Sequence, residues 1–385
     1  MAGIYFHIPF CSRFCRYCDF YSETKIDLID RFIYSLKREL NCRKEQINSM
    51  GVPITSIYFG GGTPSLLSPS QIGSIIEELS NISEIEPSSI NRMEVTIEVN
   101  PDDISLDYLK SLKSNYVNRV SIGVQSFIDL HLEWMNRRHN SKRAIDAFNM
   151  AREAGFDNIS LDLIFGFSQL KEQDLKYNIE RLLSLSPEHI STYQLSIEKS
   201  TQLFRDYSSG KYSPPTDSEC NKQYYTIKRE LEKGGYYQYE ISNYSKEGYR
   251  AIHNSSYWDH SPYLGFGPSA HSFIENRRFW VESDLFRYLE ILEGSCGDIS
   301  KLYHQEILSE IDLFNELIML SLRVLKGIDY NTLIRRCPKG HVKGFMGLLE
   351  RLLEDNELVL DDGYIKIPPE KLFVSDGIIS SLFIL

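Results

Sequence analysis

The sequence predicts an α/β fold in which a partial (β/α)6 barrel is followed by a C-terminal helical, winged-helix-like domain. Short runs rich in Ile, Val, Tyr and Phe alternate with longer segments whose apolar residues recur every 3.6 positions. Repetition of this alternation along the first half indicates a parallel sheet, which right-handed crossovers curl toward a barrel. Three helical patterns and a hairpin pattern near the end of the chain predict the second domain.

The first half contains the elements of the predicted barrel. The expected strands are residues 3–8, 54–59, 93–99, 118–124, 158–164 and 189–195. The expected helices between them are residues 27–50, 69–82, 105–114, 141–154 and 172–185. We expect the C-terminal ends of these strands to share one face of the barrel.

The pattern changes after about residue 200. Residues 208–219 are rich in turn-forming residues and predict a linker, and residues 220–233 predict a helix, whereas 234–271 has no clear assignment. From residue 304 we expect a helix to 325, then helices at 330–336 and 343–353, and a hairpin at 358–367 that turns at Asp361-Asp362-Gly363. The expected domains are therefore residues 1–200, 201–303 and 304–385.

Composition excludes several classes of protein. The formal net charge of −11 argues against nucleic acid as a partner, because phosphate binding needs a basic surface, and the winged-helix-like domain is itself acidic. No stretch reaches the length of a membrane span, and the start MAGIYFHIPFC does not resemble a signal peptide. We therefore expect a cytoplasmic protein without a disulfide framework. The cysteines expected to be ordinary thiols are Cys42, Cys220, Cys296 and Cys337.

Three cysteines directly follow the first expected strand. Cys11, Cys15 and Cys18 have the spacing C-x3-C-x2-C, and neither His nor a fourth Cys lies close by in sequence. A tetrahedral zinc site normally has four ligands, whereas three thiolates suit a 4Fe–4S cluster with one open iron. That iron can bind the amino and carboxylate groups of S-adenosylmethionine, whose reductive cleavage would give a 5′-deoxyadenosyl radical. The alternatives are buried structural cysteines or an incomplete zinc site.

Polar or glycine-rich residues follow the other expected strands. The run GGGT at 60–63 would let the backbone approach a ligand closely. Glu98 could accept hydrogen bonds from a ribose, and Arg137 could pair with the methionine carboxylate. Gln125 and Asp162 belong to the same series of strand residues. Each residue alone is explained equally well as a solvated strand end or a satisfied buried polar group, but together with the cysteines they predict a cofactor site.

These motifs carry a specific resemblance. YFHIPFCxxxCxYCDF, YFGGGTPSLL, TIEVNP, NRVSIGVQSF, LDLIFG and STYQLSIE resemble the oxygen-independent coproporphyrinogen III oxidase-like family of radical SAM proteins. The resemblance implies a radical SAM barrel and S-adenosylmethionine contacts from Tyr5, Tyr17, Gly61, Gly62, Thr63, Glu98, Gln125, Arg137 and Asp162. Family members usually read GLPGQ after the fifth strand. This chain reads Gly166-Phe167-Ser168-Gln169 there, which leaves contacts beyond Asp162 unassigned.

Within that family, the chain is most similar to the heme-chaperone branch. The dehydrogenases have a further Cys where this chain has Phe20, and a longer segment before the cluster, where this chain has ten residues before Cys11. The chaperone branch has the motif HNxxYW, which occurs here at residues 253–258. The resemblance implies that this motif binds heme, with His253 as the candidate iron ligand. The alternative for His253 is a loop histidine bonded to backbone, and His7, His260 and His271 are weaker candidates.

The leading hypothesis is therefore a heme chaperone with a 4Fe–4S cluster, S-adenosylmethionine and heme. Its expected partners are heme, acceptor hemoproteins and an electron donor such as flavodoxin or ferredoxin, with at most weak membrane association through partners, as a monomer or homodimer. The second hypothesis is a radical enzyme of tetrapyrrole metabolism such as coproporphyrinogen III dehydrogenase, which Phe20 and the short N-terminal segment argue against. The third is a radical SAM methyltransferase with an unrelated substrate. We expect heme to bind apart from the cluster, because His253 lies far beyond the barrel segments.

Overall fold

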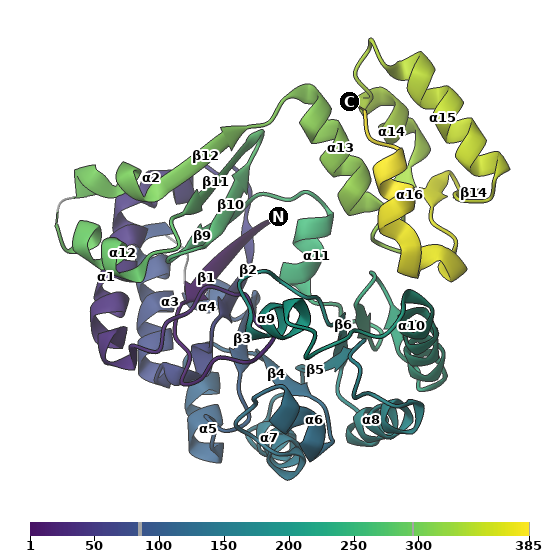
Figure 1. Cartoon of the computed structure of the whole chain (residues 1–385). Coiled ribbons are helices and arrows are strands. Elements are labelled where there is room, and N and C mark those ends of the chain that lie inside the picture. Colours follow the sequence, from purple (N-terminus) through teal and green to yellow (C-terminus); the bar gives the residue numbers. More distant parts are fainter. Residues whose placement is uncertain (84–86, 295, 385) are drawn as a thin grey trace.

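The computed structural model describes residues 1–83, 87–294 and 296–384 (Figure 1). Its centre is a parallel sheet whose strands neighbour one another in chain order, as the sequence predicts. These strands are β1 (Ala2–Ile8), β2 (Ile54–Gly61), β3 (Glu94–Val99), β4 (Arg119–Gln125), β5 (Ile159–Phe165) and β6 (His189–Gln194). The predicted α/β barrel is thereby confirmed.

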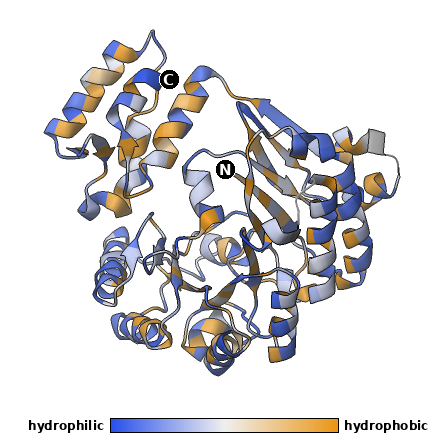
Figure 2. Cartoon of the chain, turned by 180° about the vertical axis from the view of Figure 1, so that it is seen from behind, coloured by the Kyte–Doolittle hydropathy of each residue, from blue (hydrophilic) through white to orange (hydrophobic). Residues whose placement is uncertain are grey.

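Helices cover the outer face of the sheet, and a cavity lies along its inner face. The connecting helices are α1 (Ile29–Cys42), α2 (Lys44–Asn48), α3 (Pro69–Ser83), α4 (Pro87–Ile90), α5 (Leu106–Ser114), α6 (Asp129–Trp134), α7 (Ser141–Glu153) and α8 (Glu172–Leu185). Because side chains alternate along a strand, Ile4 and Phe6 of β1 enter the apolar layer, whereas Tyr5 faces the cavity. Figure 2 shows this layering as mostly hydrophobic strands behind helices with one hydrophilic face.

Residues 201–307 extend the sheet at both edges. Next to β6 lie β8 (Asn243–Ser245) and β7 (Tyr237–Gln238), and next to β1 lie β9 (Tyr263–Phe266), β10 (His271–Ile274), β11 (Arg277–Val281) and β12 (Tyr303–Ile307), which completes a 12-stranded sheet. The helices of this part are α9 (Gln202–Ser208), α10 (Asp217–Lys233), α11 (Ile252–Trp258) and α12 (Leu285–Glu293). The segment that sequence patterns left unassigned therefore supplies strands to both edges, as well as α11.

The C-terminal elements form a separate group beside α11 in Figure 1. They are α13 (Glu310–Ser321), β13 (Ile328–Asp329), α14 (Tyr330–Arg336), α15 (Val342–Glu354), β14 (Val359–Asp361), β15 (Tyr364–Lys366) and α16 (Ser375–Ser381). The three-stranded sheet has the order β13-β15-β14. The predicted hairpin and the helices near 330 and 343 are confirmed. The predicted domain boundaries at 200/201 and 303/304 stay predictions, although one sheet includes strands from both sides of each.

Three local expectations are wrong. The helix expected at 27–50 is divided into α1 and α2 at Arg43, whose side chain is held by Glu39 and the sheet. The helix expected from 304 begins only at 310, because β12 pairs with β11 and Ser309 then caps α13. Cys42 is disulfide-bonded and is not a free thiol.

Over the described residues, we find no helix long and apolar enough to cross a membrane.

A buried carboxylate connects the barrel to the extended sheet edge. Glu39 of α1 is fully buried and forms an ion pair of 2.8 Å with Arg43, which is itself almost fully buried. The carboxylate also accepts hydrogen bonds from the Tyr288 and Tyr303 hydroxyls at 2.6 Å and from the Gly267 backbone N–H at 2.8 Å. One side chain therefore joins the first helix to the last strands of the sheet.

We predict that Glu39→Ala lowers the free energy of unfolding by about 3–5 kcal/mol, because the variant leaves Arg43 buried without its counter-charge. The measurement is anaerobic chemical denaturation followed by circular dichroism. Glu45→Ala, an exposed position in the next helix, is the matched control and should change stability by less than about 0.5 kcal/mol. A loss of less than about 1 kcal/mol in Glu39→Ala would contradict a stabilising role for this network.

Candidate functional site

A single cavity of about 630 Å³ lies along the inner face of the barrel. It is lined by the predicted cluster and cofactor residues and by the leading heme-ligand candidate: Tyr5, Cys11, Cys15, Tyr17, Cys18, Gly61, Gly62, Thr63, Glu98, Gln125, Arg137, Asp162 and His253. The weaker candidates His7, His260 and His271 are not among the residues that line it. The structure therefore brings together side chains from the loop after β1, from the ends and interiors of β2 to β5, and from α11. Their individual roles stay predictions.

The cavity has two ends. At the cluster end, the cysteine loop follows Ile8, and the loop after Gly61 lies beside it. At the α11 end, His253 packs against Gly3, at the opposite end of β1. Five residue steps of strand separate Gly3 from Ile8, or about 17 Å. His253 and the cysteines nevertheless line the same cavity, and the expectation that heme binds apart from the cluster stays a prediction.

Two glycines bring β2 against the cysteine loop. A Cβ on Gly61 would lie 2.8 Å from the His7 ring, and Gly61 also has φ +107°, which favours glycine. A Cβ on Gly62 would lie 2.6 Å from the Phe10 carbonyl oxygen. The Gly62 N–H donates to the Ile8 carbonyl at 2.9 Å. The glycine run therefore allows a close backbone contact with the cysteine loop, whereas the sequence predicted a close contact with a ligand. The same contact places Thr63 beside Cys11.

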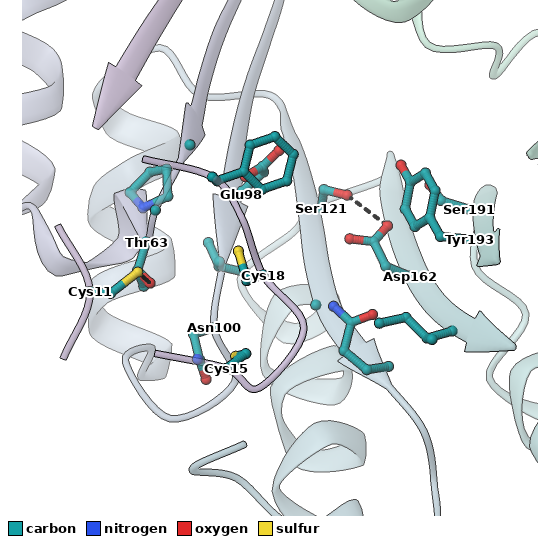
Figure 3. Close-up of a pocket in the computed structure, with 18 of the residues that line it drawn as sticks. Cys11, Cys15, Cys18, Thr63, Glu98, Asn100, Ser121, Asp162, Ser191 and Tyr193 are labelled. Atoms are coloured by element: carbon teal, nitrogen blue, oxygen red, sulfur yellow. Dashed lines mark hydrogen bonds between the residues drawn. The ribbon is translucent and has the colours of Figure 1, made fainter. Parts of the chain in front are cut away.

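The three cysteines line the cluster end together (Figure 3). Cys11 is nearly buried, and its Sγ lies 3.2 Å from Thr63 Oγ1. Arg137 donates from Nη1 to Cys15 Sγ at 3.4 Å and from Nη2 to the Gly123 carbonyl at 2.8 Å. Burial raises the pKa of Cys11 and raises that of Cys18 to about 12. Iron binding must therefore displace thiol protons.

The donor set fits a 4Fe–4S cluster better than a single metal ion. Within the described residues, no three His, Cys, Asp or Glu side chains are close enough together to hold one ion. A cubane places its three protein thiolates on different irons, so the thiols need not converge on one point. The adjacent Arg137 guanidinium supplies positive charge beside the sulfur atoms, which suits an anionic cluster.

Two carboxylates lie deeper in the cavity. Glu98 Oε1 accepts a hydrogen bond of 2.7 Å from the Tyr58 hydroxyl, and Asp162 Oδ1 accepts one of 3.2 Å from Ser121 (Figure 3). Burial raises the pKa of Glu98 to about 7, and it raises the pKa of Asp162 to about 6. Both side chains are therefore acceptors that can also take up a proton near neutral pH.

Gln125 ends β4 in the left-handed region, with φ +65°. A non-glycine residue held there costs on the order of 1 kcal/mol or more, and such strain is concentrated at functional sites. The buried Oε1 atom of Gln125 has no hydrogen-bond partner among the described residues. This combination is compatible with the predicted contact between Gln125 and the cofactor, which stays a prediction.

His253 is held at the α11 end by both ring nitrogens. Its Nδ1 lies 2.9 Å from Ser56 Oγ, and its Nε2 lies 2.9 Å from Tyr257 Oη. Burial lowers the pKa of His253 to about 3, so the imidazole is neutral. Glu94 accepts the backbone N–H groups of Ile252 and His253 at 2.8 and 2.9 Å and so fixes the start of α11 on β3. In this conformation neither nitrogen is available to a metal ion.

Sequence reasoning missed several residues of the cavity wall. Arg119, Tyr58, Ser121, Ser191 and Tyr193 all face the cavity. They lie within strands or, like Arg119, at the start of one, whereas the search covered residues near the C-terminal ends of strands. The alternation of polar residues at positions 119, 121 and 125 of β4 is the pattern that could have identified Arg119 and Ser121.

Comparisons with known proteins agree with this geometry. Residues 5–182 match the model of the radical SAM superfamily. The chain is 34% identical over 357 residues to the heme chaperone HemW of Bacillus subtilis, which covers 92% of this chain and 91% of the relative. The chain belongs to the HemW family of radical SAM proteins. It is also 31% identical to the mitochondrial radical S-adenosyl methionine domain-containing protein 1 of Danio rerio, over 100% of this chain and 87% of the relative.

The fold of this HemW family member matches a solved structure. The coproporphyrinogen III oxidase HemN of Escherichia coli, a radical SAM enzyme, has a TM-score of 0.81 and 21% identity, over 99% of this chain and 90% of that chain. This likeness shows the shared fold. The radical SAM superfamily uses a 4Fe–4S cluster and S-adenosylmethionine, and the HemW-family cavity has thiols, backbone amides and carboxylates that fit both groups.

We predict that anaerobic reconstitution loads about four irons and four sulfides per chain, as a cubane on three thiolates requires. Cys11→Ala, Cys15→Ala and Cys18→Ala should each abolish the cluster, as measured by iron and sulfide analysis and by EPR of the reduced protein. Cys220→Ala removes a buried free thiol that does not line the cavity and is the matched control. A cluster that survives the loss of Cys15 would overturn the ligand assignment.

We predict that Glu98 makes the apo-protein less stable as pH rises. Its folded-state pKa of about 7 lies above the ordinary value of 4.5. The stabilisation of the protonated carboxyl is therefore present below pH 4.5 and lost as pH rises to 7. The difference in unfolding free energy between Glu98→Gln and wild type should grow in favour of the variant across this window, as measured by urea denaturation at a series of pH values. A pH-independent difference would contradict the raised pKa.

Proposed function

We propose that this chain is a heme chaperone that binds heme and transfers it to acceptor hemoproteins. Support comes from similarity to proteins named heme chaperone HemW over nearly the whole chain. The observation that carries the proposal is the position of the HNxxYW motif. This motif forms α11, and His253, Asn254 and Tyr257 line the cavity that the cluster cysteines also line.

The cluster end suits S-adenosylmethionine. The bound cofactor would supply one-electron chemistry at the open iron of the cluster. Gly61 and Gly62 bring backbone groups close to the cysteine loop, and Arg137 offers its guanidinium to the carboxylate of the amino-acid part. Glu98 is placed to accept hydrogen bonds from the ribose. Tyr5 and Tyr17 line the same wall and limit access of water to the site.

Heme binding through His253 depends on a change in the contacts of this side chain. Both ring nitrogens are hydrogen-bonded, and the side chain is almost completely buried. Coordination to heme iron would therefore require His253 to give up its hydrogen bond to Ser56 or to Tyr257. The neutral imidazole, whose pKa is lowered by burial, is the form that donates to iron.

A second candidate function is radical chemistry on a tetrapyrrole, as in coproporphyrinogen III oxidation, which the shared fold with HemN favours. Phe20 argues against it. This side chain is 64% exposed and lines the cavity where the resemblance places a further cysteine in the dehydrogenases. A phenyl ring provides neither a metal ligand nor a redox-active thiol at that position.

The proposal extends to partners. Reduction of the cluster needs a one-electron donor such as flavodoxin or ferredoxin, and delivery needs an acceptor hemoprotein. We propose that the protein acts in the cytoplasm as a monomer or homodimer, with the division into residues 1–200, 201–303 and 304–385 described above. The net charge of −11 favours partners with basic docking surfaces.

We predict that wild-type protein binds heme with a Soret band typical of imidazole ligation. His253→Ala should shift the band and lower the affinity, with iron–sulfur content unchanged. Tyr257→Phe keeps the ring but frees Nε2 of His253, so heme affinity should rise. His304→Ala removes an exposed imidazole and is the control for adventitious ligation. An unaltered spectrum in His253→Ala would place the iron ligand elsewhere.

The same reduced protein, supplied with S-adenosylmethionine, should form no protoporphyrinogen from coproporphyrinogen III. The measurement is anaerobic incubation followed by chromatography of the oxidised porphyrins. Product formed with multiple turnovers would favour the second function. Absence of heme binding in wild-type protein would reject the chaperone proposal.

A further inference from the structure

Arg119 is a buried cation for which the described part of the chain provides no ion-pair partner. It begins β4, is 2% exposed and lines the cavity. Its Nε has no hydrogen-bond partner among the described residues. Among the described residues, no carboxylate oxygen lies within 4.0 Å of an Arg119 nitrogen, so Arg119 forms no ion pair there. A guanidinium cannot give up its proton at accessible pH, so an unpaired buried one is costly.

The surroundings of Arg119 show where its charge acts. The charge of Arg119 lowers the pKa values of Glu98 and Asp162, although burial keeps both raised, and contributes to the lowered pKa values of His189 and His253. The two carboxylates are therefore close enough for the guanidinium charge to change their pKa values, but neither forms an ion pair with it. Both imidazoles are neutral and are held by other hydrogen bonds.

The backbone of Arg119 is well separated from the carbonyl group that Arg137 contacts. Arg137 donates to the carbonyl of Gly123, and Arg119 lies four strand residues before Gly123. Four steps along a strand correspond to about 13 Å. S-adenosylmethionine has one carboxylate, which Arg137 at the cluster end is placed to hold. Arg119 lies toward the α11 end and remains available for a second anionic group.

We propose that Arg119 anchors a second binding compartment at the α11 end of the cavity, which takes the carboxylate of a ligand other than S-adenosylmethionine. The inference rests on the proposed function in one respect, the placement of S-adenosylmethionine at the cluster end. Carboxylate is the chemistry that fits, because it accepts two parallel hydrogen bonds from a guanidinium and neutralises its charge.

The compartment can offer a further donor to the same group. Asn254 of α11 lines the cavity together with Arg119. Asn254 Nδ2 makes only a long hydrogen bond of 3.4 Å, to Tyr239 Oη. The carboxylate could belong to a small free acid or to a side arm of a larger ligand, such as a heme propionate, and the experiment separates these sources.

The first arm tests a small acid. Protein loaded with cluster and S-adenosylmethionine is heated in sodium propionate or in sodium chloride of equal ionic strength. We expect propionate to raise the melting temperature of wild type but not of Arg119→Met, which should fold at least as stably because an unpaired buried charge is removed. Arg119→Lys should retain part of the response. Arg138→Met, which removes a cavity arginine already paired with Asp103, should retain all of it.

The second arm tests a ligand side arm. Soret titrations compare heme with heme dimethyl ester, whose propionates carry no charge. If the propionate is the bound group, wild type should prefer free heme by about tenfold or more, and Arg119→Met should lose this preference. The EPR response of the cluster to S-adenosylmethionine should persist in Arg119→Met.

The outcomes separate this inference from the proposed function. A propionate effect in a protein that binds no heme rejects the chaperone function and supports the anion compartment as a site for a small acid. Equal binding of heme and its ester, with no propionate effect in wild type, rejects the compartment and leaves the chaperone function standing. Loss of the S-adenosylmethionine response in Arg119→Met assigns Arg119 to the cofactor site and overturns the inference.

Discussion

The contact between the glycines that end β2 and the loop that follows β1 is the constraint on which the site depends. Neither Gly61 nor Gly62 has room for a Cβ, because the His7 ring and the Phe10 carbonyl occupy that space. This contact fixes the cysteine loop over the strand ends and sets Thr63 against Cys11. A methyl group at either glycine would move the loop, and with it the thiols, away from the carboxylates of β3 and β5.

Much of this site could be predicted from sequence, because its cluster end uses contiguous motifs. The cysteine spacing, the glycine run and the strand residues Glu98 and Asp162 are local patterns, and the parallel order of strands brings their ends together. The α11 end depends on contacts between distant segments. The hydrogen bond between Ser56 and His253 joins residues 197 positions apart, so no pattern near His253 indicates that its nitrogens are occupied.

The cavity also shows that buried ionisable side chains differ in whether they can become neutral. Its carboxylates have raised pKa values and its histidines lowered ones, so burial lets these groups adopt neutral forms. Arginine has no neutral form to adopt. Arg137 donates hydrogen bonds from its two terminal nitrogens to a thiol and a carbonyl. Among the described residues no such contact is found for Arg119, and the Nε atom is unpartnered in both arginines. Sequence reasoning is also weak at the starts of strands, since a single Arg at the start of an apolar strand gives no local sign of the direction in which its side chain points.

The fixing of α11 on β3 has a consequence for ligand exchange. Glu94 holds the first two backbone N–H groups of α11, and Ser56 and Tyr257 hold the imidazole. Any ligand that coordinates His253 must first break part of this set, so its apparent affinity is the intrinsic affinity reduced by the small fraction of open molecules. A ligand bound through His253 would therefore be held more loosely than by a protein whose imidazole has a free nitrogen.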